Sequence, residues 1–247
     1  MKNKIFKYIG IFLISILIIT GVSLITASNL SGSAKIISES EVTKYDLVAS
    51  IPYKYKKTSK IASLQEQYQN PDIVGLVRIP QTSINEIVLQ GNDNTYYLSH
   101  DINKNKTIAG STYLDTRSNF QNGRKNIIYS HNSPTLPLPF HELENYYNEE
   151  FYQSHQYIEL EDDYGLNKYQ IFSVYVEATD WSYYQKFTFA TEQEWLSHLQ
   201  QLKNKSWYQT NVDVNATDEI LILQTCSFHE NFQQYQNKYL LVIAKKI

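Results

Sequence analysis

Short apolar runs separated by turn residues recur from about residue 71 to the end of the sequence. Runs of this length that stop at Gly, Pro, Asn or Asp are typical of β-strands. They predict eight strands, at residues 73–79, 84–89, 111–114, 126–131, 157–160, 169–177, 219–226 and 239–245. Eight strands are enough to close a barrel and so to remove the exposed edges of a sheet. We therefore expect a mainly β fold built on a closed eight-stranded β-barrel.

Two segments between these strands have helical patterns instead. Residues 141–147 form a short one. Residues 192–205 place four apolar side chains at helical spacing, Trp195, Leu196, Leu199 and Leu202, and Thr191 is a suitable N-cap. This longer helix falls between the sixth and seventh predicted strands. Residues 46–70 predict one or two short helices, which should end near Pro71 because the residue before a proline avoids the helical conformation.

The first 45 residues have a different pattern from the rest. Three lysines (Lys2, Lys4 and Lys7) precede residues 8–27, which carry no charged side chain. About 20 helical residues span roughly 30 Å, the thickness of a bilayer core. We expect residues 1–7 to be a cytoplasmic tail, 8–27 a transmembrane anchor, 28–45 a Ser-rich tether, and 46–247 a folded domain outside the cell. A signal peptide cleaved near Ser28 is the alternative.

Composition narrows the classes of function. Hydrophobic residues make up 42% and charged residues 19% of the chain, as in ordinary globular proteins, and the net charge of -3 gives no reason to expect a nucleic-acid partner. The 21 tyrosines favour β structure and suit a groove for an extended peptide, because each offers an apolar body and a polar tip. Neither metal-ligand spacing nor a Gly-rich phosphate loop occurs, so we expect no metal or cofactor.

The single cysteine, Cys226, ends the predicted strand 219–226. It cannot form an internal disulfide, so it is either an inert packing residue or a free thiol with chemistry of its own. A strand that ends in Thr225-Cys226 would deliver the sulfur from a rigid element to the edge of the fold. A thiol nucleophile there would need a base or a cationic neighbour to populate its thiolate.

Six histidines could serve that thiol: His100, His131, His141, His155, His198 and His229. His131 ranks first, because it also ends a predicted strand and two strand ends of one barrel can meet. His229 ranks second, because it follows Cys226 by three residues. His198 falls on a helix face, where a surface or packing role is expected.

The segments Ile222-Leu-Gln-Thr-Cys226 and Tyr129-Ser-His-Asn132 each end or follow a predicted strand. The first resembles the motif T-L-x-T-C and the second the motif Y-G-H-N, both of the sortase family, class B. Residues 74–80, 89–100, 109–117 and 171–176 resemble further family segments, in the family's order, so that the resemblance covers about residues 45–247. One such motif would be weak, whereas six in order favour a nucleophilic role for Cys226.

The resemblance implies a membrane-anchored cysteine transpeptidase of the Gram-positive cell surface. Its thiol, Cys226, attacks the carbonyl of a Thr in the C-terminal sorting signal of a surface protein or pilin, and His131 gives a proton to the leaving amine. An amine of a cell-wall precursor or a pilin lysine then displaces the thioacyl-enzyme. The substrate groove implied by the family comprises Asn94, Leu98, Thr179, Tyr183 and Tyr184, with Gln224 and Thr225 beside the thiol. Core packing for Leu98 and loop filling for the two tyrosines are the alternatives.

The chain departs from the family at one catalytic position. The family has an Arg about ten residues after the Cys, whereas the three arginines of this chain, Arg78, Arg117 and Arg124, all precede Cys226. Counting back from the last strand gives Tyr239 or Lys238, and counting forward gives Gln236. We expect Lys238 to supply the missing charge, although it lacks the planar fork of a guanidinium. A catalytically weak or inactive relative, acting as a membrane-tethered peptide-binding or pilus-assembly factor, is the alternative function.

Overall fold

The structure is a computed structural model that describes residues 59–180 and 182–247. The predicted tail, anchor and tether lie outside the described residues, so these three assignments stay predictions. Among the residues that are described, no helix is long and apolar enough to cross a membrane.

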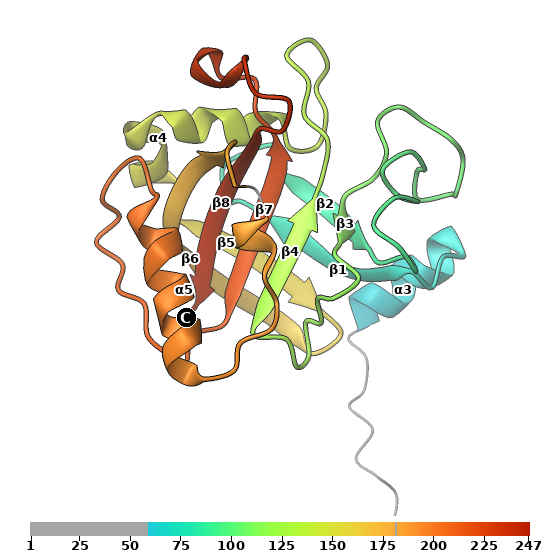
Figure 1. Cartoon of the computed structure of the whole chain (residues 1–247). Helices are drawn as coiled ribbons and strands as arrows, with labels where there is room; N and C mark the ends of the chain where they lie inside the picture. Colours follow the sequence, from blue (N-terminus) through green and yellow to red (C-terminus); the bar gives the residue numbers. More distant parts are fainter. Residues whose placement is uncertain (1–58, 181) are drawn as a thin grey trace, which may run out of the picture. The chain divides into compact units, whose positions relative to one another are not determined.

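Eight strands close into a barrel, as the apolar runs predict (Figure 1). They are β1 (Ile73–Arg78), β2 (Asn85–Leu89), β3 (Tyr113–Leu114), β4 (Lys125–Tyr129), β5 (Tyr157–Asp162), β6 (Gly165–Glu177), β7 (Ile220–Cys226) and β8 (Tyr239–Lys246). Their order around the barrel is β1-β2-β3-β4-β7-β8-β6-β5. The prediction of a mainly β, closed eight-stranded fold is confirmed.

The parallel pairing of β4 with β7 is the feature that positions the functional residues. Tyr129 of β4 lies opposite Gln224 of β7, and the register is regular along both strands. Parallel strands run toward the same edge of a sheet, and in Figure 1 both arrowheads point the same way. The chain just after β4, which carries His131, therefore reaches the same end of the barrel as Cys226.

Side chains on both faces of the central strands are buried, which explains why their sequences read as unbroken apolar runs. One cluster fills the barrel and includes Val77, Val88, Ile128, Leu223 and Val242. A second lies on the outer face of the same strands and includes Ile127, Ile222, Leu241, Trp195 and Leu199. Successive side chains of β4 and β7 therefore pack alternately into the first and the second cluster.

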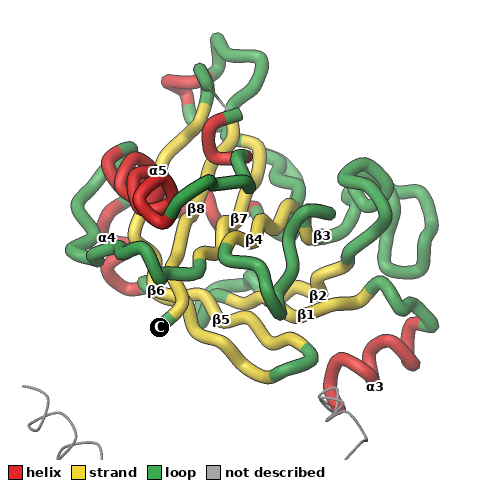
Figure 2. Tube along the Cα trace, turned by 60° about the horizontal axis from the view of Figure 1, so that its bottom comes forward, coloured by secondary structure: helices red, strands yellow, loops and turns green. Residues whose placement is uncertain are grey.

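The helices cover the barrel from outside. They are α3 (Ser59–Tyr68), η1 (His141–Tyr147), α4 (Glu149–Ser154), η2 (Tyr183–Gln185), α5 (Glu192–Asn204) and η3 (Glu230–Phe232). The predicted helix between the sixth and seventh strands is α5, and the hydroxyl of Thr191 caps it by accepting the Glu194 N–H at 3.1 Å. Figure 2 shows α5 and α3 on opposite sides of the barrel. The short predicted helix at 141–147 is a 3₁₀ helix, and α4 follows it directly.

Candidate active site

Cys226 is the last residue of β7, and its side chain is exposed, which favours the free thiol over the inert packing residue. The preceding residue, Thr225, points to the other face, as alternation along a strand requires. Its side chain is buried, and its hydroxyl donates to the carbonyl of Ser130 at 2.8 Å. This bond ties the end of β7 to the end of β4 and fixes the direction in which the thiol emerges.

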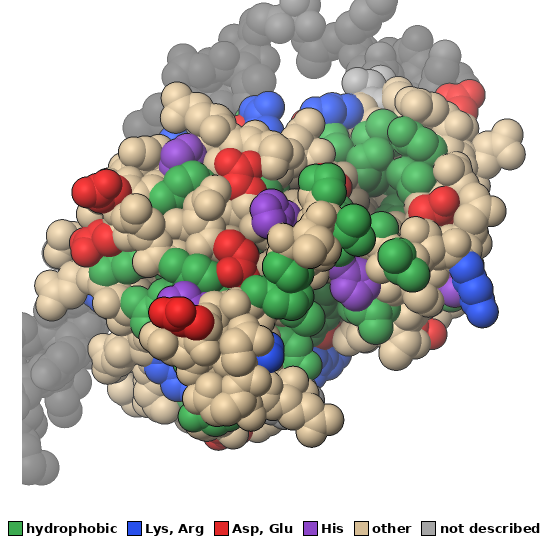
Figure 3. Space-filling view, turned by 90° about the horizontal axis from the view of Figure 1, so that it is seen from above, with side chains coloured by type: hydrophobic (Ala, Val, Ile, Leu, Met, Phe, Trp, Pro, Cys, Tyr) green, Lys and Arg blue, Asp and Glu red, His purple; other side chains and the backbone are tan. Residues whose placement is uncertain are grey.

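A groove of about 450 Å³ opens around the thiol. Eleven residues line it: Asn94, Leu98, Tyr113, Tyr129, Ser130, His131, Gln185, Gln224, Thr225, Cys226 and Tyr239. Figure 3 looks onto this end of the barrel, where hydrophobic side chains run across the face with histidines among them. The structure thus brings together six of the residues named from the sequence, namely Cys226, His131, Asn94, Leu98, Gln224 and Thr225. Their roles in catalysis or binding stay predictions.

His131 lies two residues beyond the end of β4 rather than within the strand, and it is half-buried. Its Nε2 is 2.7 Å from the carbonyl oxygen of Leu98. A carbonyl can only accept, so Nε2 carries a proton and the other ring nitrogen, Nδ1, holds the lone pair in the neutral imidazole. The chain at Leu98 therefore sets both the orientation and the tautomer of this histidine.

A carboxylate that the sequence did not single out joins the two strand ends. The buried Asn132 donates its side-chain amide to Glu144 of η1 at 2.7 Å and to the carbonyl of Cys226 at 3.1 Å. Glu144 also accepts the backbone N–H of Phe228 at 3.0 Å. Because both partners of the Asn132 amide are acceptors, its orientation is fixed. The Glu144 carboxylate thus binds both Asn132, which follows His131, and Phe228, which lies two residues after Cys226.

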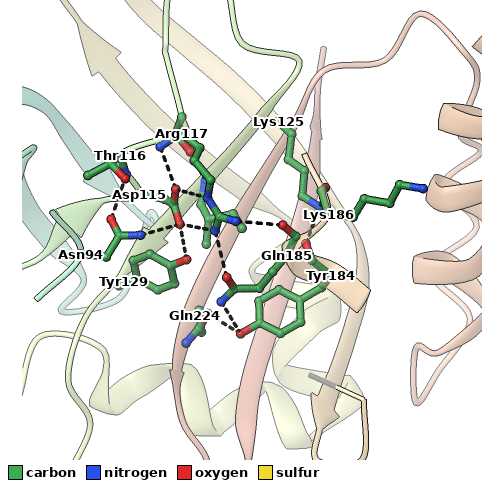
Figure 4. A network of polar contacts seen from close by, with 12 residues as sticks. Asn94, Asp115, Thr116, Arg117, Lys125, Tyr129, Tyr184, Gln185, Lys186 and Gln224 are labelled. Atoms are coloured by element: carbon green, nitrogen blue, oxygen red, sulfur yellow. Dashed lines mark hydrogen bonds and ion pairs between the residues drawn. The ribbon is translucent and has the colours of Figure 1, made fainter. Parts of the chain in front are cut away.

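A polar network supports the groove from beneath (Figure 4). Asp115, which is fully buried, accepts from the Arg117 guanidinium at 2.7 Å, from the Tyr129 hydroxyl at 2.6 Å and from the Asn94 amide at 3.0 Å. Burial alone would raise the pKa of Asp115, but the hydrogen bonds from Arg117 and Tyr129 lower it below its ordinary value. The ionised carboxylate therefore holds Asn94 at the groove wall.

Gln185 is a groove residue that sequence reasoning missed. Arg117 donates to its backbone carbonyl at 3.2 Å and to its side-chain oxygen at 2.9 Å. Its amide donates to the Tyr184 hydroxyl at 3.2 Å, and that hydroxyl donates to Gln224 at 2.7 Å. The only feature of the sequence that could have indicated Gln185 was its position next to Tyr184, in the segment after β6.

The geometry is that of an exposed thiol and a histidine at neighbouring strand ends of a closed barrel. Residues 77–247 match the family model described as a Sortase domain. The chain belongs to the sortase family. The relatives and solved structures that it matches place it among the class B sortases.

Two kinds of comparison carry this class assignment. A curated relative, Sortase B of Staphylococcus aureus (strain NCTC 8325 / PS 47), is 34% identical over 179 residues, which is 72% of this chain and 71% of the relative. The structure of a Staphylococcus aureus sortase B–substrate complex is similar with a TM-score of 0.69 and 31% identity, and covers 83% of this chain and 92% of that one. A sortase B complexed with triglycine is similar with a TM-score of 0.66 and 30% identity, over 76% and 96% of the two chains.

Four residues that the sequence placed in the sortase site do not line the groove. Thr179 is in the loop after β6, and Tyr183 packs its ring against His198 at a centroid distance of 5.0 Å. Tyr184 is fully buried and supports Gln224 from beneath. Lys238 directs its ammonium toward the side-chain oxygen of Gln233 at 3.3 Å.

His229 lies outside the groove as well. Its ring packs against Tyr147 at a centroid distance of 4.6 Å and against Trp207 at 5.9 Å. Its Nδ1 accepts the backbone N–H of Asn231 at 3.2 Å. Nearness in sequence to Cys226 therefore does not bring this imidazole to the groove.

The electrostatic setting of the thiol combines two opposing effects. The groove walls desolvate Cys226 and raise its pKa above the ordinary value, although the side chain opens to solvent. The charge of Lys238 lowers the pKa of Cys226 and offsets part of this effect. The thiol is therefore mostly protonated at neutral pH, and attack requires transfer of its proton. Within residues 59–180 and 182–247 no cluster of three His, Cys, Asp or Glu side chains could hold a metal ion.

Proposed function

We propose that this class B sortase is a membrane-anchored transpeptidase. It cleaves a C-terminal sorting signal and joins the carrier protein to an amine through a thioester on Cys226. The observation that carries the proposal is the exposed Cys226 in a groove of about 450 Å³ that His131 also lines. The family to which the chain belongs consists of cysteine transpeptidases, which supports the same reaction.

The chemistry follows in two steps. The Cys226 thiol gives its proton to Nδ1 of His131, since Nε2 is bonded to the Leu98 carbonyl, and the sulfur attacks the carbonyl carbon of the peptide bond while the π electrons move to the oxygen. The C–N bond then breaks, and the His131 imidazolium gives the proton on Nδ1 to the leaving amine. The second amine attacks the thioester carbonyl, the C–S bond breaks, and a proton of that amine passes to the sulfur through His131. Dividing the transfer in this way replaces one difficult step by two easier ones.

The proposed donor substrate is the sorting signal of a surface protein or pilin. Its binding involves Asn94, Leu98, Gln224 and Thr225, which line the groove. Leu98 is 45% exposed, which supports a contact with substrate over core packing. The acceptor is an amine of a cell-wall precursor or a pilin lysine. Solved sortase B structures with substrate and with triglycine support a peptide donor and an amine acceptor.

The proposed location is the outer face of a Gram-positive cell membrane, with residues 8–27 as a single anchor. The three lysines before an uncharged stretch of bilayer length support this orientation.

An inactive or weak sortase that binds peptides for pilus assembly is the second candidate. The observation in its favour is that no arginine lines the groove, although all three arginines are described. Removal of one donor to an oxyanion costs about 10²–10³ in rate.

The test is to trap the acyl-enzyme. The full chain in detergent is incubated with a library of sorting-signal peptides, and adducts are located by mass spectrometry. We expect a thioester on Cys226 and none in Cys226→Ala. Turnover that survives Cys226→Ala, or an adduct elsewhere in the chain, would contradict the assignment. Binding of peptides without any adduct would favour the assembly factor.

A further inference from the structure

The tetrahedral intermediate needs a hydrogen-bond donor close to Cys226. Attack on a carbonyl places negative charge on its oxygen, and a fixed donor at that point is commonly the largest contribution to catalysis. The arginines are all engaged elsewhere. Arg78 pairs with Glu159 at 2.5 Å and Arg124 with Glu192 at 2.8 Å. Arg117 is bound to Asp115 beneath the groove.

Tyr239 lies directly across the sheet from the thiol. It is the register partner of Cys226 in the antiparallel pair of β7 and β8. Partners in such a pair project from the same face of the sheet, with Cβ atoms about 5 Å apart. Tyr239 is half-buried and lines the groove together with Cys226.

Lys238, the neighbouring residue, is directed elsewhere. Successive side chains of an extended segment point to opposite faces, so 238 and 239 cannot both face the thiol. The Lys238 ammonium contacts the side-chain oxygen of Gln233 at 3.3 Å, and the backbone carbonyl of Lys238 accepts the N–H of Ser227 at 2.9 Å. Its charge still reaches the thiol through space and lowers the pKa of Cys226.

The other tyrosines near the groove are not register partners of Cys226. Tyr129 lies on β4 opposite Gln224, and Tyr184 lies in η2. Tyr113 lies on β3, which is separated from β7 by β4. Among the groove tyrosines, Tyr239 is the one directly across from the thiol.

We propose that the Tyr239 hydroxyl donates the hydrogen bond that holds the oxyanion formed at Cys226, and that Lys238 acts only on the charge of the thiol. The inference rests on the proposed attack by Cys226. Burial and the neighbouring Cys226 raise the pKa of Tyr239, so the phenol keeps its proton under working conditions. A neutral donor of this kind would replace a guanidinium with one directed hydrogen bond.

Two reactions of the Cys226 sulfur distinguish the proposed role of Tyr239, which is to bind the oxyanion, from that of Lys238, which is to stabilise the thiolate. The 4-nitrophenyl ester of N-acetyl-threonine acylates Cys226: a C–S bond forms, the carbonyl electron pair moves to oxygen, and collapse expels 4-nitrophenolate. Iodoacetamide alkylates the same sulfur by displacement of iodide and forms no oxyanion. The first rate reports the donor and the thiolate together, whereas the second reports the thiolate alone.

With the full chain in detergent, Tyr239→Phe is expected to lower the acylation rate at least tenfold and to leave alkylation within twofold. Tyr235→Phe is the matched control: this tyrosine lies in the loop before β8 and outside the groove, and both rates should stay within twofold. Lys238→Ala should lower both rates in the same proportion, because it removes a charge that stabilises the thiolate.

The inference is overturned if Tyr239→Phe acylates at the wild-type rate, or if Lys238→Ala loses acylation alone. It is also overturned if Tyr113→Phe shows the selective loss in place of Tyr239→Phe. The ester requires neither a sorting signal nor an amine. A chain that is acylated by the ester but transfers no peptide would therefore contradict the proposed transpeptidase. The role of Tyr239 would still be decided separately, by the ratio of the acylation rate to the alkylation rate in Tyr239→Phe.

Discussion

His131 and His229 differ in what their side chains contact. The first lies in the groove, bonded through Nε2 to the Leu98 carbonyl, and has Nδ1 left for proton transfer. The second is packed among aromatic rings outside the groove. His229 is only three residues from Cys226, but this nearness along the chain does not place its imidazole in the groove.

We therefore expect His131→Ala to lower thioester formation by at least about 10²-fold, the usual contribution of a positioned acid–base group. His229→Ala should lower it by less than tenfold, through loosening of the loop after β7. Rates of acyl-enzyme formation by mass spectrometry, with far-UV circular dichroism to show an intact fold, check both. A larger loss in His229→Ala would move the acid–base role to that loop.

At the scale of elements, a buried lysine connects β4 to η2 beside the groove. The Lys125 ammonium donates to the backbone carbonyls of Tyr184 and Lys186, and it is 3.0 Å from Nε2 of His198. Burial lowers the pKa of Lys125 to about 7. Burial and the charge of Lys125 lower the pKa of His198 to about 3, so the imidazole is neutral and accepts the bond. The two carbonyls flank Gln185, which lines the groove.

This arrangement predicts a pH-dependent stability. Between pH 7 and the ordinary pKa of 10.5, the unfolded chain keeps the Lys125 proton and the folded chain does not. Folding then releases a proton, so the contribution of Lys125 to the free energy of unfolding rises with pH through this window and is least below pH 7. Urea unfolding of wild type and Lys125→Met at pH 6 and pH 9 checks the sign.

At pH 9 we expect Lys125→Met to be less stable by about 1–3 kcal/mol, the cost of leaving a buried carbonyl unpaired. At pH 6 the difference should be smaller, because the wild type then carries a buried charge. Lys186→Met removes an exposed ion pair with Glu194 and should cost under about 1 kcal/mol. A difference between wild type and Lys125→Met that is the same at both pH values would contradict the buried charge.

The strands and the longer helix could be predicted because each is encoded locally. Apolar runs bounded by turn residues locate all eight strands, and the apolar stripe with Thr191 locates α5. Three short elements were missed, α4, η2 and η3, because each has too few residues to show an apolar period of its own. His198 lies on α5 and is buried, in agreement with the packing role that was one of its two expected roles. Its contact with Lys125 could not be predicted, because the two residues are distant in sequence.

At the scale of the whole molecule, the proposed anchor at residues 8–27 can be tested on cells. We expect residues 8–27 to remain as an anchor, so that the chain sediments with membranes and protease added to intact protoplasts digests the folded domain. A cytosolic protein that stays intact serves as the control for protoplast integrity. Recovery of a soluble chain that begins near Ser28 would show that the segment is a cleaved signal peptide.

The sequence by itself determined the barrel, the single thiol and its motif, because periodicity and motif order are properties of the chain alone. It also indicated His131, since a strand end is visible in the pattern. Only the tertiary structure decided which residue faces Cys226 across the sheet, because register depends on how β7 and β8 pair and not on counting along a loop. That pairing places Tyr239, rather than Lys238, across from the thiol. Contacts between segments that are distant in sequence bring Gln185 to the groove wall and Glu144 to the side-chain amide of Asn132.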